Sequence, residues 1–393
     1  MGKRNLIIMW TANFFVAASA TMVLPFLSIY IETFGDFSDA YVQRWSGFIF
    51  GITFLVAFVV APFWGRFGDK FGRKKILIIT GYGVALTIIA MSLVDSTAEL
   101  FVLRALMGVV TGFIPTSMAL ISAQTAKHEA GKVLGTLQMG TVSGGLFGPV
   151  IGGLLADAFG FTYTFFITGI VIMAATTLVA FGINEFVREE NEPAAEKKSM
   201  IEVIKWTISS PILLMVMILS FVVQTANFSI QPQLALYVGQ LTEAENLAFL
   251  AGLAFSVTGL GNLVATRIWG IQGDRHGHDK IVMICLVLCA LFFLPQAFAG
   301  SVSELIVLRF LFGIALGGII PCATAYIRTK APMDIQGEVL GYNQSFRFLG
   351  NVAGPAAGGA FAGSFGIASV FYLSTGLLLV MAVLFYIVYK KSG

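Results

Sequence analysis

Charged residues are scarce in this chain, and their scarcity excludes a water-soluble domain. Only 11% of the 393 residues are Asp, Glu, Lys or Arg, whereas soluble domains carry about 25%. Hydrophobic residues make up 57%. Because so few charges cannot cover a surface that faces water, most of this surface must face lipid.

Cysteine and histidine are equally sparse. The three cysteines all lie in apolar runs, which predicts buried free thiols rather than disulfides: Cys285, Cys289 and Cys322. The three histidines are expected in loops, without the ligand set of a metal site: His128, His276 and His278. We therefore predict no metal and no cofactor. No nucleophile–base arrangement stands at membrane depth, which disfavours a membrane enzyme.

Long apolar runs are what the sequence does contain. A helix needs about twenty apolar residues to cross the hydrocarbon of a bilayer. Twelve runs of this kind predict an all-α membrane protein; they lie near residues 6–31, 46–64, 76–94, 100–123, 134–157, 163–184, 211–238, 247–270, 281–300, 304–327, 338–362 and 366–389. The first run is too long for a signal peptide and ends without a cleavage motif, so we expect it to remain in the protein.

The basic residues are distributed asymmetrically between the connections. Twenty of the 24 Lys and Arg residues fall on one side of the predicted spans, and only Arg44 falls on the other. Arg104, Arg309 and Arg347 lie inside spans. Because cations resist translocation, this pattern predicts a plasma-membrane protein with both termini in the cytoplasm. The cations are not clustered on one face, so no nucleic-acid partner is predicted.

The two halves of the chain repeat each other at an offset of about 205 residues. Residues 99–108 recur as 304–313, and 148–153 recur as 354–359. We predict an N-terminal six-helix bundle over 1–184, a cytoplasmic linker over 185–210 and a C-terminal six-helix bundle over 211–393. The end of the linker, Ser199 to Trp206, has the pattern of a short amphipathic helix. Repeats of this kind suit alternating access, although a duplicated channel would share them.

A glycine-rich basic segment, GRFGDKFGRKK, stands between the second and third runs at residues 65–75. Its glycines, Gly65 and Gly72 among them, permit a tight turn. Asp69 can accept hydrogen bonds from helix amides or from Arg73, which would form a latch that a rocking motion breaks. A degenerate copy at residues 270–277 contains Asp274. The alternative is a basic loop that only obeys the charge asymmetry.

The order Gly-x-x-x-Asp-[Lys/Arg]-x-Gly-Arg-Lys resembles the signature of the major facilitator superfamily, with Phe67 where Leu is usual. The fifth span is similar to the signature of the superfamily's antiporter branch, and the eleventh span repeats the spacing: Gly144, Gly148, Pro149, Gly152, Gly153, Gly354 and Pro355. The resemblance covers the whole chain and points to twelve-span drug/proton antiporters of the bacterial multidrug efflux type. It implies two pseudo-symmetric six-helix bundles around a central cavity.

The same resemblance implies that an arginine at position 104 takes part in proton coupling. Many drug/proton antiporters carry an acid in the first span, but the neutral Thr21 stands there in this chain. Our candidates for proton coupling are Glu32, which could reach Arg104, together with Asp69 and Arg104 itself. Snorkelling to the surface is the alternative for Arg104. Three embedded arginines without a mid-depth acid predict a positive cavity that favours anionic or zwitterionic amphipaths.

Amides and aromatic rings inside spans are candidates for substrate binding, because amides adapt their hydrogen bonds and rings accept varied apolar groups. The candidates are Asn13, Phe14, Gln224, Asn227, Gln231, Gln344 and Arg347. Polar packing between helices is the competing interpretation for each of them.

Together these features predict a monomeric, proton-coupled exporter of amphipathic drugs that works by alternating access, with protons, small molecules and membrane lipids as its partners. A lipid, lysolipid or small-metabolite transporter of the same fold is the first alternative. A membrane enzyme is less favoured.

Overall fold

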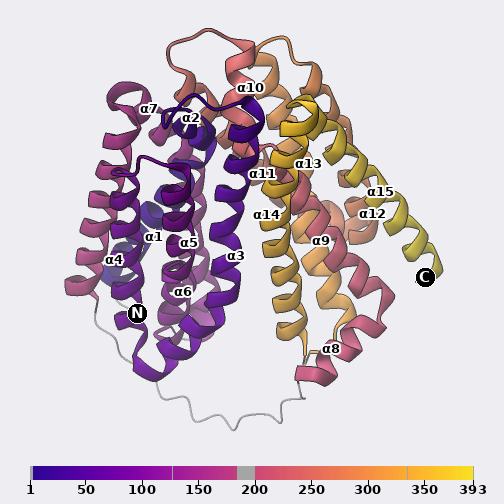
Figure 1. Ribbon diagram of the computed structural model, residues 1–393. Coiled ribbons are helices and arrows are strands. Elements are labelled where there is room, and N and C mark those ends of the chain that lie inside the picture. The colour runs from indigo at the N-terminus through magenta and orange to yellow at the C-terminus, as the bar shows by residue number, and fades with distance from the viewer. Residues whose placement is uncertain (1–2, 126, 184–199, 334, 393) are drawn as a thin grey trace. The chain divides into compact units, whose positions relative to one another are not determined.

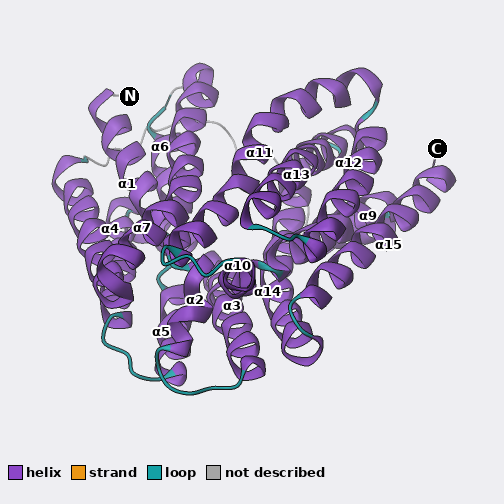
Figure 2. Ribbon diagram, turned by 90° about the horizontal axis from the view of Figure 1, so that it is seen from above, coloured by secondary structure: helices purple, strands orange, loops and turns teal. Residues whose placement is uncertain are grey.

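The computed structural model describes residues 3–125, 127–183, 200–333 and 335–392 (Figure 1). Every regular element in these ranges is an α-helix or a short 3-10 helix, and the connections between them are short (Figure 2). The predicted all-helical class is therefore confirmed.

The first half of the chain contains eight elements that precede the linker. They are α1 (Lys3–Met22), η1 (Leu24–Phe26), α2 (Leu27–Glu32), α3 (Asp39–Phe71), α4 (Arg73–Met91), α5 (Thr97–Val109), α6 (Phe113–Ala123) and α7 (Lys127–Gly182). The second half contains α8 (Met200–Ser209), α9 (Pro211–Ser229), η2 (Gln231–Gln233), α10 (Leu234–Leu241), α11 (Leu247–His276), α12 (His278–Phe293), η3 (Leu294–Phe298), α13 (Val302–Lys330), α14 (Gln336–Phe365) and α15 (Ala368–Ser392).

These elements form twelve membrane spans. Within the described ranges, ten helical stretches are long and apolar enough to cross a bilayer. One of them, within α7, holds two spans, because its 56 residues at about 1.5 Å each far exceed a hydrocarbon core of about 30 Å. The two spans meet at Gly160, whose backbone is non-helical (φ 81°, ψ 168°). Helix α14 supplies the remaining span.

A helix cap that occurs in both halves explains why Glu99 and Glu304 begin the matching segments 99–108 and 304–313. The Ser96 hydroxyl accepts from the Glu99 amide at 3.3 Å, and the Glu99 carboxylate accepts from the amide of Asp95 at 3.1 Å. The Ser301 hydroxyl likewise accepts from the Glu304 amide at 3.2 Å. Such reciprocal bonds satisfy amides that have no partner within their own helix. The repeated glutamates therefore mark where α5 and α13 begin.

The fourth span is broken, whereas its counterpart α13 is continuous. Residues 109–115 read VVTGFIP, and the matching residues 314–321 read IALGGIIP, which is one residue longer. A missing residue rotates the rest of a continuous helix by about 100°. The non-helical break between α5 and α6 lets α6 face in the direction that a continuous helix with one residue fewer would not allow.

The helices group into two compact units. The first comprises the described residues within 1–38, 48–191 and 234–256, and the second comprises those within 39–47, 192–233 and 257–393. In the first unit α1 and α4 both pack along α7 (Figure 1). In the second unit α9 packs along α14 and α15, and α12 packs against α13 and α15. The boundaries 1–184 and 211–393 stay a prediction, because α10 and the start of α11 group with the first unit.

Three sequence expectations need correction. Residues 65–71 continue α3 instead of forming an open turn, and the chain reverses only at Gly72, whose φ of 97° suits glycine. His276 and His278 stand at the ends of α11 and α12 rather than in a loop. The backbone of His128 is likewise helical, within α7. The expected amphipathic segment after the linker is present as α8, while residues 184–199 lie outside the described part of the chain.

Candidate functional site

The glycines of the fifth span form a stripe against α1. A Cβ added at any of four of them would overlap a carbonyl oxygen of α1: Gly140 at Trp10, Gly144 at Phe14, Gly148 at Ala18 and Gly152 at Met22. The eleventh span repeats the arrangement on α9, with Gly350 at Phe221, Gly354 at Thr225 and Gly358 at Ser229. Small residues every four positions let the two backbones approach closely. The antiporter-type motif is therefore a helix-packing groove in both repeats.

A second face of the same motif joins the two sequence repeats. In the first unit, Gly252 of α11 lies directly on the Pro149 carbonyl, and Gly153 lies on the Ala248 carbonyl. In the second unit, Gly47 of α3 lies on the Pro355 carbonyl, and Gly359 lies on the Gln43 carbonyl. We call these contacts the α7–α11 seam and the α14–α3 seam. The motif residues are thus positioned where an element of one repeat meets an element of the other.

The α7–α11 seam ends in a contact that the sequence analysis did not single out. The Asp157 carboxylate accepts from the amides of Ala248, at 3.1 Å, and Phe249, at 2.8 Å. Asp157 is the only Asp, Glu, Lys or Arg between residues 133 and 182. That isolation was the available signal, but only the fold shows which helix the carboxylate meets.

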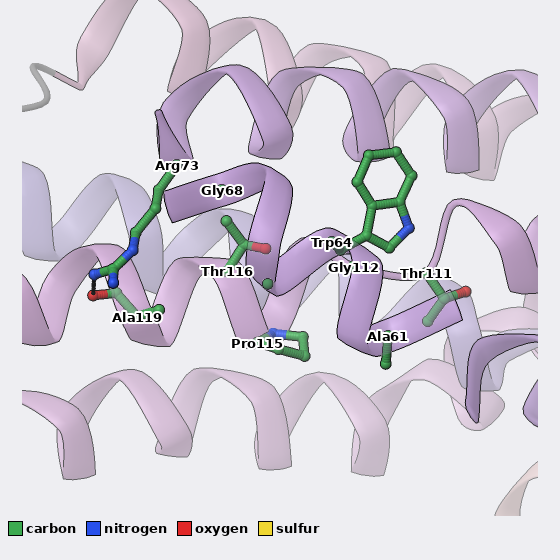
Figure 3. Close-up of a pocket in the computed structure, with 10 residues that line it drawn as sticks. Ala61, Trp64, Gly68, Arg73, Thr111, Gly112, Pro115, Thr116 and Ala119 are labelled. Carbon is green, nitrogen blue, oxygen red and sulfur yellow. Dashed lines mark hydrogen bonds between the residues drawn. The ribbon is translucent and has the colours of Figure 1, made fainter. Parts of the chain in front are cut away.

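The end of α3 and the start of α4 border a cavity of about 200 Å³. The other walls of this cavity come from α6 and from the break before α6, and the lining residues include Trp64, Gly68, Arg73, Gly112 and Ala119 (Figure 3). Arg73 Nη1 donates to the carbonyl of Ala119 at 2.6 Å. The predicted latch residue Arg73 is thus anchored to α6. The side chain of Asp69 lies outside the described part of the structure.

The corresponding loop of the second repeat has the same backbone and different chemistry. Gly277 has a φ of 99°, and its amide donates to the carbonyl of Gly273 at 2.9 Å. His278 occupies the place of Arg73, and its Nε2 lies 3.4 Å from the carboxylate of Asp274. The predicted latch residue Asp274 therefore has a histidine partner on the next helix.

Arg104 is buried inside the first unit, with an exposed fraction of 3%, and does not snorkel to the surface. Its Nε lies 3.5 Å from the carbonyl oxygen of Ile49, and Nη1 lies 3.7 Å from the sulfur of Met107. Glu32, at the end of α2, is not among the partners described for Arg104. The structure therefore does not bring these two proton-coupling candidates together.

Arg309 is the counterpart of Arg104 and is buried in the second unit. Its Nη2 lies 3.5 Å from Oε1 of Gln231, whose amide nitrogen donates to the carbonyl of Asn227 at 3.2 Å. Gln224 is buried on the same helix, α9, beside Gly350. Three of the predicted substrate-binding residues, Gln224, Asn227 and Gln231, thus lie on α9 and η2. Gln231 links the buried Arg309 to the main-chain carbonyl of Asn227.

Arg347 is half-buried on α14, and its Nη1 donates to Oε1 of Gln344 at 2.8 Å. The two predicted substrate-binding residues of this helix are therefore paired with each other, one turn apart. The Arg347 Nε atom is buried without a hydrogen-bond partner. An additional acceptor at this position would satisfy it.

Asn13 and Phe14 are neighbours in sequence but lie against different helices. The Ser117 hydroxyl of α6 donates to Asn13 Oδ1 at 2.8 Å, and Asn13 Nδ2 is buried without a partner. Phe14 stacks on Trp10 at 5.7 Å and lines an apolar cavity of about 90 Å³ between α1 and α7. Within the described residues, no cluster of His, Cys, Asp and Glu has the composition of a metal site.

The chain matches known proteins over at least 97% of its length. The Major Facilitator Superfamily model matches residues 9–246 and 216–392. The uncharacterized MFS-type transporter YuxJ of Bacillus subtilis is 57% identical over 97% of both chains. The multidrug resistance protein MdtG of Salmonella typhi is 37% identical over 97% of this chain and 94% of that protein.

Solved structures agree on the fold. A bacterial homologue of the lysosomal transporter Spinster has a TM-score of 0.82 at 13% identity, covering 99% of this chain and 98% of that one. The D323A mutant of the nucleoside transporter NupG has a TM-score of 0.81 at 12% identity, covering 98% of this chain and all of that one.

These findings define a multi-pass membrane transporter of the secondary, small-molecule type, not an enzyme. The chain belongs to the major facilitator superfamily and has its all-helical, twelve-span fold.

Proposed function

We propose that this transporter is a proton-coupled exporter of amphipathic drugs that works by alternating access. The observation that carries the proposal is the 37% identity with a multidrug resistance protein along 97% of the chain. The packing of the glycine–proline motif supports it. Its two seams join elements of different repeats and consist largely of glycine against main-chain oxygen, a contact without interlocking side chains that can separate and reform.

The embedded arginines support a preference for anionic or zwitterionic substrates. A charge at bilayer depth costs about 2.5–3.5 kcal/mol on insertion scales, so such a residue is a candidate for a function. The described partners of Arg104 and Arg347 are neutral carbonyl, thioether and amide groups. Among these described partners there is no carboxylate, so the positive charge of the two side chains favours an anionic ligand.

Transport in proteoliposomes tests both parts of the proposal. An imposed pH gradient should drive accumulation of a fluorescent anionic drug, and a cationic drug of similar size should accumulate less. Arg347→Gln should lower transport of the anion more than that of the cation. Arg66→Gln, which removes an exposed arginine near the end of α3, serves as the matched control. Flux that ignores the gradient, or a clear preference for the cation, would contradict the proposal.

A lipid phosphate would also suit buried arginines, so the experiment includes a fluorescent lysolipid. Transport of the lysolipid without transport of either drug would favour a lipid transporter of the same fold.

We also propose that the protein lies in a plasma membrane with both termini in the cytoplasm. The basic connections and the two termini lie on the same side of the predicted spans, and cations resist translocation. Impermeant thiol labelling of Thr242→Cys, in the loop before α11, should succeed from outside intact cells. Labelling of Ser392→Cys should require permeabilised cells. The reverse result would invert the topology.

A further inference from the structure

The cavity of about 200 Å³ at the junction of α3 and α4 has no part in the function proposed above. None of the residues that line it is among the predicted substrate-binding residues. Its apolar walls come from Ala61, Trp64, Pro115 and Ala119 (Figure 3). Because an apolar cavity of roughly 150 Å³ can bind benzene, this one has room for a single aromatic ring.

The second repeat fills the corresponding position with side chains. A Cβ added to Gly273 would overlap the ring of His278 and would lie 3.0 Å from the sulfur of Cys322. A Cβ added to its counterpart, Gly68, would meet nothing nearer than 3.6 Å, where it reaches the side chain of Arg73. The fourth span is broken next to this position, whereas α13 is continuous. The open space is therefore a property of the first repeat and not a requirement of the fold.

A polar side chain that lines the cavity has no described partner for its hydroxyl. Thr116, on α6, has an exposed fraction of 7%, and in Figure 3 it lies between Arg73 and Trp64. Its amide donates to the carbonyl of Gly112, but no hydrogen bond is described for the hydroxyl. Buried polar groups usually have a partner. A ligand that accepts a hydrogen bond from Thr116 would supply one.

The charges beside the cavity favour an anionic ligand. Residues 65–75 contain five basic residues and one acid. One of the basic residues, Arg73, lines the cavity and donates from Nη1 to the carbonyl of Ala119 at 2.6 Å. A guanidinium has five N–H donors, of which this bond uses one, and arginine bonds carboxylates strongly. The cavity thus combines apolar walls with a cation and a hydroxyl donor.

We propose that this cavity binds a small aromatic carboxylate and that its occupancy slows transport. The ring lies against Trp64 and Pro115, and the carboxylate accepts from Thr116 and Arg73. The walls belong to α3, α4, α6 and the break before α6. Because a ligand stabilises the conformation that binds it, occupancy opposes movement of these elements. The effect on transport rests on the alternating-access function proposed above, whereas the binding does not.

Equilibrium dialysis of the purified full-length protein in detergent micelles against radiolabelled benzoate tests the binding, with protein-free micelles as the blank. Benzoate should bind saturably, with half-saturation near about 1 mM, as expected of a ligand with few atoms. Benzyl alcohol, which is neutral, and benzylammonium, which is a cation, should each bind at least about tenfold more weakly, because they lack the charged acceptor.

Variants locate the bound benzoate. Thr116→Val keeps the shape of the side chain, removes the hydroxyl and should weaken binding about tenfold. Ala119→Leu fills the cavity and should abolish binding, with a melting temperature close to that of the wild type. Thr87→Val is the matched control, since the Thr87 hydroxyl donates to the carbonyl of Gly83 at 3.0 Å, within α4. Arg347→Gln, at a predicted substrate-binding residue, should also bind benzoate as the wild type does.

Transport in proteoliposomes tests the effect of occupancy. Benzoate should slow pH-driven drug flux through the wild type at the concentrations at which it binds. Thr116→Val should need about tenfold more benzoate for the same inhibition. Flux through Ala119→Leu should be insensitive to benzoate, which separates this site from competition at the substrate-binding residues.

The site would be overturned by the absence of saturable binding, by equal binding of benzoate and benzylammonium, or by binding that Arg347→Gln abolishes while Thr116→Val and Ala119→Leu retain it. Loss of benzoate binding when phospholipid is added to the micelles would assign the cavity to a lipid chain instead. Binding without any effect on drug flux would contradict the control of transport. Failure of the proposed function looks different: the wild type then shows no pH-driven drug flux, while dialysis still decides whether the cavity binds benzoate.

Discussion

The indole nitrogen of Trp64 donates a hydrogen bond of 2.6 Å to the carbonyl oxygen of Val109, at the point where α5 ends. The second repeat contains the same bond, from Trp269 to the carbonyl of Ile314 at 2.8 Å. The two bonds differ in context. Val109 is the last residue of α5, whereas Ile314 lies inside the continuous helix α13. The bond from Trp64 therefore satisfies a carbonyl at a helix end, whereas the bond from Trp269 reaches a carbonyl inside a continuous helix.

We predict that Trp64→Phe is more destabilising than Trp269→Phe. Without its indole donor the Val109 carbonyl loses its described partner, while a main-chain amide four residues on can still bond Ile314. The expected loss for Trp64→Phe is about 1 kcal/mol beyond that for Trp269→Phe. Thermal unfolding of both variants in detergent measures the difference. Equal melting temperatures would show that the break in the fourth span does not depend on Trp64.

We predict that the glycines of the two seams do not tolerate a larger side chain. A methyl group at Gly252 would overlap the Pro149 carbonyl, and one at Gly47 would overlap the Pro355 carbonyl. Because main-chain oxygens cannot move aside as a side chain can, Gly252→Ala and Gly47→Ala should each lower transport severalfold and destabilise by about 1–3 kcal/mol. Gly145→Ala is the control, since a methyl group there meets nothing within 4 Å. Wild-type transport in the two seam variants would contradict the close contact.

Two arginines near the junction of α3 and α4 differ in their contacts. Arg73 is hydrogen-bonded to α6 through Ala119, whereas Arg66 is exposed. Arg73→Ala should reduce transport roughly tenfold, because a bond from a charged donor contributes about 1.5 kcal/mol. Arg66→Ala should leave transport near the wild-type rate. Drug efflux from cells, normalised to the amount of protein in the membrane, compares the two variants. Equal losses would indicate that these basic residues only set the orientation of the protein in the membrane.

The neighbours Asn13 and Phe14 should give different phenotypes. Asn13→Ala removes a buried amide with an unsatisfied nitrogen, so it should change the relative transport of different drugs with little change in melting temperature. Phe14→Ala enlarges the cavity between α1 and α7. It should destabilise by about 2–3 kcal/mol, less than a fully buried phenylalanine. A selectivity change in Phe14→Ala at unchanged stability would return that residue to the substrate-binding candidates.

Much of the fold was predictable, because the relevant signals are local. The apolar runs predicted the spans, and the repeat predicted paired elements such as Gly72 and Gly277, which share the same positive φ. The local prediction for the segment 65–71 was wrong. The segment 65–71 reads as a glycine-rich loop, yet it continues α3, since Gly65 and Gly68 tolerate helical geometry and only Gly72 has a backbone that favours glycine.

The candidate site was less predictable than the fold. Arg347 and Gln344 were both named from their depth in a span, and a spacing of three residues lets them meet on one helix face. Glu32 and Arg104 were also named together, but they lie on separate elements whose approach depends on packing. Their roles, and those of the other named residues, stay predictions.

The sequence by itself determined the membrane class, the twelve spans, the internal repeat and the positions of the motifs, because hydropathy, charge and spacing are properties of consecutive residues. Tertiary structure decided what those motifs touch. That Gly153 meets Ala248, and that Asp157 accepts from the amides of Ala248 and Phe249, depends on residues about 90 positions apart along the chain. No pattern in consecutive residues encodes such a contact, because the packing of helices, not the local sequence, brings the two ends together.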